Sequence, residues 1–200
     1  MKVEGRVGII NASVGTINPL VTDKLGRLIP PAGKYTEAAM AGRLFYASTQ
    51  THVSTSATKN DTFTGIALVN PSASGKVYIV HEFSWALDDS PTADTALSLA
   101  VGPVHAGYAA DLAITCARNG YATSVAICDT SASITGASLV LVKHVATIGT
   151  NATTDLLTNT PPVDLGGSII LDPGRIVCTD SILASGAFLF LGFMWEEVPE

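Results

Sequence analysis

The chain has 200 residues, and only 14% of them are charged, against about 25% in an average soluble domain. Its net charge of −6 argues against nucleic acid as a partner, because phosphate binding depends on clustered lysine and arginine. The longest apolar run, residues 187–195, is far shorter than the roughly 18 residues that cross a membrane. We therefore expect one β domain that binds neither nucleic acid nor a membrane.

The N-terminal part of the sequence differs from the rest. Residues 1–33 show no sustained hydrophobic period, and the pair Pro30-Pro31 favours extended or turn backbone. The segment also lacks the features of a secretory signal. We expect an extended N-terminal arm over residues 1–33 and a β-sandwich domain over residues 34–200.

A short helix and two strands are expected next. Thr36 and Glu37 begin an alanine-rich stretch that Gly42 closes, which predicts a short N-capped helix. Residues 63–70 and 76–87 are predicted strands joined by a loop. In the second of these strands, every other side chain would form one apolar face. That face would consist of Val77, Ile79, His81, Phe83, Trp85 and Leu87.

The middle of the chain predicts a short strand and a hairpin. Leucine and valine alternate over residues 97–101, which indicates a strand. Asn119-Gly120 lies between two apolar runs and is typical of a hairpin turn. We expect it to pair residues 112–116 with residues 124–129.

A second hairpin is expected after a further strand. Residues 137–145 are rich in valine and leucine, which predicts a strand covered on both sides, in the sandwich or in an assembly. A polar loop follows over residues 147–162. The Asp-Pro-Gly sequence at residues 172–174 then suits a turn with proline second and glycine third. It predicts a hairpin between residues 168–171 and 175–180.

The last predicted strand, residues 186–197, carries apolar side chains on both faces, so both faces need cover. In total about eight strands emerge. Their number and spacing favour a jelly-roll-like antiparallel β-sandwich with an N-terminal arm and one short helix.

Cysteine and glycosylation patterns indicate no special chemistry. The cysteines lie in apolar runs and are expected to be buried structural thiols. Asn-x-Ser/Thr sequons occur without a secretory signal, so we expect them to be unmodified. The cysteines are Cys116, Cys128 and Cys178, and the sequon asparagines are Asn11, Asn60 and Asn151.

Two segments partly match motifs that bind phosphate or zinc. Residues 72–77 are similar to a phosphate loop, but they lack the first glycine and the magnesium-binding hydroxyl. His81-Glu82 begins like a zinc-binding helix, yet Trp85 occupies the second histidine position and the segment reads as a strand. A hydrogen-bonded core histidine is the favoured interpretation.

The remaining histidines and the acidic pairs are also candidates. His52, His105 and His144 lack metal-like spacing, although a symmetric oligomer could gather copies of one around its axis. The pairs at residues 88–89 and 196–197 could supply a glycosidase acid and base, but solvated charges are favoured. The aromatic run at residues 188–195 could line a sugar site, with core or subunit interface favoured.

Three segments resemble small virion proteins of tailed bacteriophages, of the cement, decoration or head-fibre type. They are KYTEAAMAGRLF at residues 34–45, FTGIALVNP at 63–71 and GFMWEEVP at 192–199. The resemblance implies a jelly-roll-like subunit, often trimeric, that stabilises a capsid lattice through many repeated contacts. It implies a place in the virion after synthesis in the host cytoplasm.

The low charge favours the same function, since neutral surfaces mark subunit contacts. We expect a structural virion protein that forms a homo-oligomer, with a trimer favoured, and that contacts the major capsid protein lattice. We expect no enzymatic activity, no cofactor, and no catalytic or metal-binding residues. The alternative is a carbohydrate-binding or receptor-binding fibre-head module, because the same architecture carries lectins.

Overall fold

The computed structural model describes most of the chain beyond the predicted arm. Residues 1–33 lie outside the described part, as do His105 and the three sequons. Ala38–Glu200 form the unit that contains both sheets. The described ranges are 34–54, 65–89, 93–104, 108–130, 139–150, 161–181 and 188–200.

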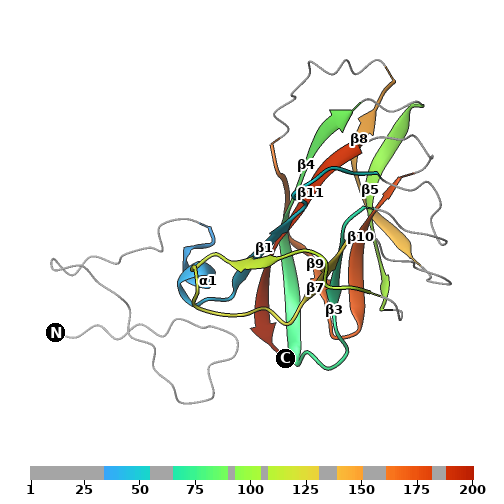
Figure 1. Ribbon diagram of the computed structural model, residues 1–200. Helices are drawn as coiled ribbons and strands as arrows, with labels where there is room; N and C mark the ends of the chain where they lie inside the picture. Colours follow the sequence, from blue (N-terminus) through green and yellow to red (C-terminus); the bar gives the residue numbers. More distant parts are fainter. Residues whose placement is uncertain are drawn as a thin grey trace, which may run out of the picture. The chain divides into compact units, whose positions relative to one another are not determined.

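Within these ranges the chain forms two antiparallel sheets and one short helix (Figure 1). The helix is α1 (Thr36–Met40). The first sheet contains β1 (Leu44–Ser48), β2 (Val53–Ser54), β4 (Lys76–Asp89), β6 (Ile114–Cys116), β9 (Val163–Leu171) and β11 (Phe188–Pro199). The second contains β3 (Ala67–Asn70), β5 (Thr95–Pro103), β7 (Ile127–Asp129), β8 (Val140–Ile148) and β10 (Arg175–Ser181). The predicted all-β sandwich is confirmed.

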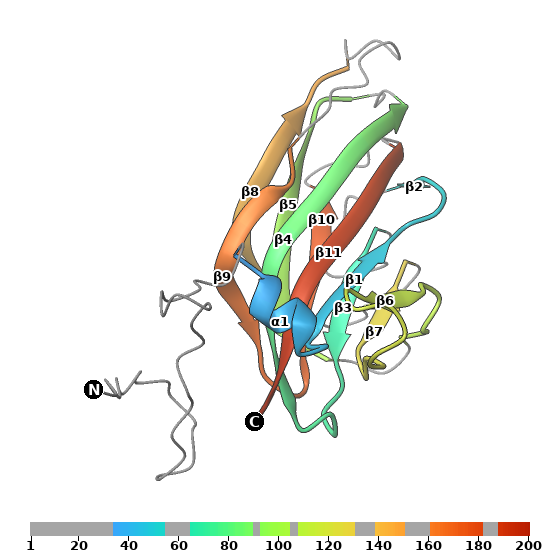
Figure 2. The same cartoon turned by 90° about the vertical axis from the view of Figure 1, so that its left-hand side faces the viewer.

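The strand order is that of a jelly roll. The first sheet runs β6-β1-β11-β4-β9, and the second runs β7-β3-β10-β5-β8. The long strands pair in a nested way, β1 with β11, β3 with β10, β4 with β9 and β5 with β8. Such nesting winds two Greek keys into one double sheet. Figure 1 shows the two layers next to each other, and Figure 2 looks onto the first sheet.

Both predicted turns form, but both predicted hairpins are wrong. The Arg175 N–H donates to the Asp172 carbonyl at 3.1 Å, and Gly174 has a φ of 82°. The Tyr121 N–H likewise donates to the Arg118 carbonyl at 3.0 Å. However, β9 and β10 lie in different sheets, and so do β6 and β7. A turn motif reverses the chain locally, whereas nested long-range pairing decides which sheet the next strand joins.

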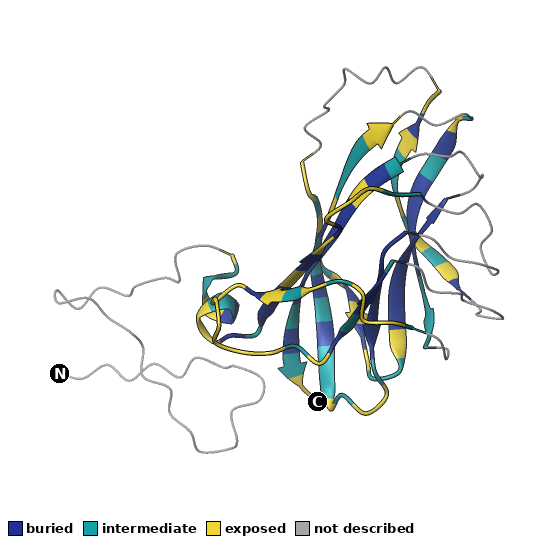
Figure 3. Ribbon diagram, viewed as in Figure 1, coloured by how far each residue is buried: buried dark blue, intermediate teal, exposed yellow. Residues whose placement is uncertain are grey.

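Aromatic side chains fill much of the space between the sheets. Trp195, Tyr78, Phe45 and Phe83 are among the largest fully buried residues. Phe45 stacks on Trp195 with ring centroids 6.1 Å apart, and Phe83 lies 5.1 Å from Phe193. Buried residues run along both sheets (Figure 3). In β11 the face that packs in the core consists of Leu189, Leu191, Phe193 and Trp195.

The uniform apolar face predicted for β4 is wrong in its first half. Tyr78 and Val80 are fully buried, whereas Ile79 and His81 are only partly buried. The pairing of β4 with both neighbouring strands shifts register around His81. An extra residue in a strand changes the phase of the alternation. The predicted face therefore points to the core only from Phe83 onward.

The predicted short helix is confirmed as α1. Gly42 has a φ of 70°, and its N–H donates to the Ala39 carbonyl at 3.0 Å, as expected for a glycine that ends a helix. No helix in the described part of the chain is long and apolar enough to span a membrane.

Candidate functional site

The two edges of the sandwich differ. At one edge the short strands β6 and β7 extend the two sheets, and the Leu112 N–H donates to the Cys128 carbonyl at 3.2 Å. At the other edge lie β9 of the first sheet and β8 of the second (Figure 2). Among the described residues, no strand pairs with the outer side of either. We call this side of the molecule the open edge.

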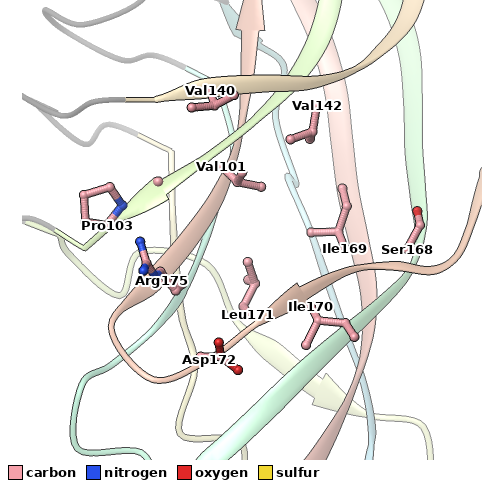
Figure 4. Close-up of a pocket in the computed structure, with 11 residues that line it drawn as sticks. Val101, Pro103, Val140, Val142, Ser168, Ile169, Ile170, Leu171, Asp172 and Arg175 are labelled. Atoms are coloured by element: carbon pink, nitrogen blue, oxygen red, sulfur yellow. The ribbon is translucent and has the colours of Figure 1, made fainter.

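A groove of about 360 Å³ runs along the open edge. Val101 of β5 and Val142 of β8 line it from one sheet, and Ile169 and Leu171 of β9 line it from the other (Figure 4). Ile169 and Leu171 are themselves buried core residues. The groove therefore lies directly beside the hydrophobic core.

Three exposed apolar side chains form the rim of the groove. They are Val140, Val142 and Ile170, which are 60%, 46% and 58% exposed. They are three of the eight large apolar side chains that are exposed in the described ranges. Contiguous apolar surface of this kind marks interaction sites more than single scattered residues do. Cover was predicted for both sides of the strand that contains Val140 and Val142, but among the described residues these two side chains remain exposed.

The backbone of β8 is irregular where it borders the groove. Its pairing with β5 shifts register between Leu99, which is opposite Lys143, and Ala100, which is opposite Leu141. Val142 therefore has no partner residue on β5 and forms a bulge in β8. Bulged edge strands resist extension by another strand. We expect a partner to contact the open edge through side chains.

Charged residues lie only at one end of the groove. Asp172 and Arg175 flank the turn between β9 and β10, and both are exposed (Figure 4). An acidic and a basic group at one end of an apolar groove can fix the orientation of a partner.

The acidic pairs proposed for glycosidase chemistry are far apart. Asp89 is opposite Phe188, whereas Glu196 is opposite Ile79 at the other end of the same strand. Ten residues of strand correspond to about 33 Å. Glycosidase carboxyls lie about 5–9.5 Å apart, so these pairs cannot act together within one chain.

Glu197 belongs to a buried polar cluster. Its carboxylate accepts hydrogen bonds from Lys76 Nζ at 2.7 Å, from Trp195 Nε1 at 3.3 Å and from the Ser124 hydroxyl. Burial, followed by the nearby Glu197 charge, raises the pKa of the Tyr78 hydroxyl. Lys76, the lysine of the phosphate-loop-like segment, thus pairs with a buried carboxylate. Its arrangement is that of a structural ion pair.

His81 lies at the bulge in β4 and not on a helix. Its Nε2 atom is 3.5 Å from the Glu196 carboxylate, which also accepts a hydrogen bond from Arg43 Nε at 2.8 Å. Trp85 lies four residues further along the same strand. The geometry of a zinc-binding helix is therefore absent from this segment.

Two other histidines have polar neighbours. His52 pairs with the Asp88 carboxylate at the surface. His144 Nδ1 lies 2.8 Å from the Ser98 hydroxyl, and Asp180 is opposite Ser98 on the other neighbouring strand. The acid therefore flanks the serine and not the histidine, which is not the order of a catalytic triad. In the described ranges, no three His, Cys, Asp or Glu residues could jointly hold a metal ion.

The three cysteines are buried free thiols, as expected. Burial, with smaller contributions from nearby carboxylates, raises the pKa of the Cys128 and Cys178 thiols. A thiol with a raised pKa forms little thiolate and reacts slowly.

No family model, curated protein or solved structure matches this chain. The open edge is the most distinctive surface among the described residues. The sequence placed Val140, Val142 and Ile170 on strands but did not indicate that these strands meet at an edge.

Proposed function

We propose that the chain is a structural virion protein that stabilises or decorates a capsid through repeated subunit contacts. The open edge, with its exposed apolar rim in a chain of low charge, is the observation that carries this proposal. The jelly-roll architecture is compatible with it, since viral capsid domains use the same fold. The fold alone does not determine the function, because lectins share the same fold.

The expected partner at the open edge is a second copy of the chain. Fully burying a valine or isoleucine side chain contributes about 1.5–3 kcal/mol, and the three rim residues are about half exposed. A standard interface buries about 800 Å² on each partner, so the contact should extend onto neighbouring surface. Closed symmetric oligomers are the usual result of such contacts, and the phage resemblance favours a trimer.

The same proposal places the protein in the virion, in contact with the major capsid protein, and assigns it no enzymatic activity or cofactor. The separation of the acidic pairs and the order of Asp180, Ser98 and His144 support the absence of hydrolase chemistry.

Substituting the rim should separate the copies. We expect the wild-type chain to form a closed oligomer at micromolar concentration. The triple variant Val140→Ser, Val142→Ser, Ile170→Ser should raise the dissociation constant of this oligomer by about 100-fold or more. The reason is that the variant loses roughly 3 kcal/mol of apolar burial. Light scattering behind a sizing column measures the mass of each.

The control is Val125→Ser, which changes an equally exposed valine that does not line the groove. It should leave the mass unchanged. A monomeric wild-type chain, or a triple variant that assembles like the wild type, would show the proposal to be wrong.

A different surface favours the second candidate function, a carbohydrate-binding or receptor-binding fibre head. The outer face of the first sheet carries a depression that is lined by two serines and an exposed aromatic ring.

A further inference from the structure

The outer face of the first sheet has a depression of about 210 Å³ over β1, β11 and β4. Ser48 and Ser84 line it, and Gly192 lies between them, because it is opposite Ser48 on one side and Ser84 on the other. A Cβ atom at Gly192 would lie 2.7 Å from the hydroxyl oxygens of both serines. Any side chain at this position would therefore fill the space between the two hydroxyls.

The two serines supply hydrogen-bonding groups on opposite sides of the depression. Both residues are exposed, and Ser84 makes only a long hydrogen bond of 3.4 Å to the Gly192 carbonyl. A serine hydroxyl can both donate and accept hydrogen bonds. The floor can thus bind a ligand that itself carries donors and acceptors.

The exposed Phe190 ring lines the depression, and other rings lie near Phe190 or Ser48. Phe190 lines the depression and is 37% exposed, and Tyr46 is exposed two residues before Ser48 on β1. The centroid of the His52 ring lies 4.6 Å from that of the Phe188 ring and 6.5 Å from that of the Phe190 ring.

His52 also pairs with the Asp88 carboxylate. Neither residue lines the depression, so the ligand-binding groups are the two serine hydroxyls and the Phe190 ring.

We propose that this depression binds one ring of an uncharged saccharide. A pyranose ring presents an apolar face that packs on aromatic side chains and hydroxyls that bond with serines. The volume is below the roughly 300 Å³ at which drug-sized ligand pockets begin, which suits a single ring. An anionic ligand does not fit, because no lysine or arginine lines the depression and the net charge is −6.

Saccharide binding goes beyond the proposed structural role and uses a different surface from the open edge. A small site of this kind binds weakly, but many copies on one particle would raise the apparent affinity by about 100- to 10,000-fold.

Saturation-transfer difference NMR on the full chain tests the proposal, with the methyl glycosides of glucose, galactose, mannose and N-acetylglucosamine as probes. We expect saturation transfer to at least one of the four glycosides. Phe190→Ala, which removes the exposed ring, and Ser84→Val, which replaces a hydroxyl with a methyl group, should each weaken binding at least tenfold.

The matched control is Tyr121→Ala, which removes an exposed aromatic ring that does not line the depression. It should bind like the wild type. Thermal unfolding establishes that each variant is folded, and Ser84→Val provides the test if Phe190→Ala does not fold. Light scattering on Ser84→Val should give the wild-type mass, so that a failure of saccharide binding is distinguished from a failure of assembly.

Two results would overturn the saccharide site. One is the absence of saturation transfer to all four glycosides at millimolar concentration. The other is undiminished binding by folded Ser84→Val, which would place any saccharide elsewhere on the molecule.

Discussion

Trp195→Ala is expected to lower the free energy of unfolding by about 3–5 kcal/mol. Trp195 is fully buried between the sheets and stacks on Phe45 with ring centroids 6.1 Å apart. Its indole N–H also donates to the buried Glu197 carboxylate at 3.3 Å. The substitution removes a large apolar surface and one donor to a buried charge. Urea denaturation followed by circular dichroism measures the change.

Two further variants separate the contributions of the Trp195 side chain. Trp195→Phe keeps an aromatic ring and removes the donor, so we expect a smaller loss, about 1–2 kcal/mol. Phe190→Ala truncates an exposed ring on the same strand and should cost less than half as much as Trp195→Ala. If Phe190→Ala and Trp195→Ala are equally destabilising, the assignment of the two faces of β11 is wrong.

Asn70→Asp is expected to destabilise the fold by about 3 kcal/mol or more at pH 8. Asn70 is fully buried at the end of β3, and its Nδ2 atom donates to the carbonyls of Lys76 and Leu171, both at 2.8 Å. The backbone carbonyl of Asn70 accepts a hydrogen bond from the Gly174 N–H at 2.9 Å. One residue of the second sheet thus holds two strands of the first. The substitution turns both donors into acceptors and leaves buried carbonyls unsatisfied, at about 1–3 kcal/mol each.

The comparison with Asn70→Ala identifies the cause of this loss. Alanine removes the same two bonds without adding a charge, so we expect a loss of about 2 kcal/mol. Burial beside carbonyl oxygens should raise the pKa of the introduced carboxyl above its unfolded value. Asn70→Asp should then be less destabilising at pH 5 than at pH 8. Equal losses for both variants at both pH values would show that the introduced charge adds nothing. A loss well below about 1 kcal/mol for Asn70→Ala would contradict the role of Asn70 as a donor between the sheets.

Much of the fold could be predicted because hydrophobic patterns are local. Leu97, Leu99 and Val101 recur at every second position of β5, and β11 begins with a nearly continuous apolar run. Such short patterns indicate strands. β1 was missed because it has only five residues and directly follows the turn after α1. The bulge at His81 was missed because register depends on two neighbouring strands.

The candidate surfaces depend on long-range pairing that no short motif encodes. Val142 belongs to a strand that the sequence predicts, but its exposure follows from the position of β8 at an edge. Ser48, Ser84 and Gly192 are far apart in the sequence, and only the pairing of β1, β11 and β4 brings them together. The turn residues at 119–120 and 172–174 predict chain reversal correctly, but they do not specify a sheet.

The native cysteines allow the open edge to be probed by thiol labelling. All three are buried, and the pKa values of Cys128 and Cys178 are raised by burial. An introduced surface cysteine should therefore react first. Val142 and Val125 are both 46% exposed in the single chain, so Val142→Cys and Val125→Cys form a matched pair. Only Val142 lines the groove.

The labelling rate of Val142→Cys with a maleimide, relative to that of Val125→Cys, is the most direct test of whether neighbouring copies cover the open edge. At assembly concentration we predict that Val142→Cys reacts at least about tenfold more slowly, since a tenfold ratio requires only about 1.4 kcal/mol of protection. On dilution to the monomer the two rates should converge. Equal rates at every concentration would contradict the proposal that the open edge is a subunit contact.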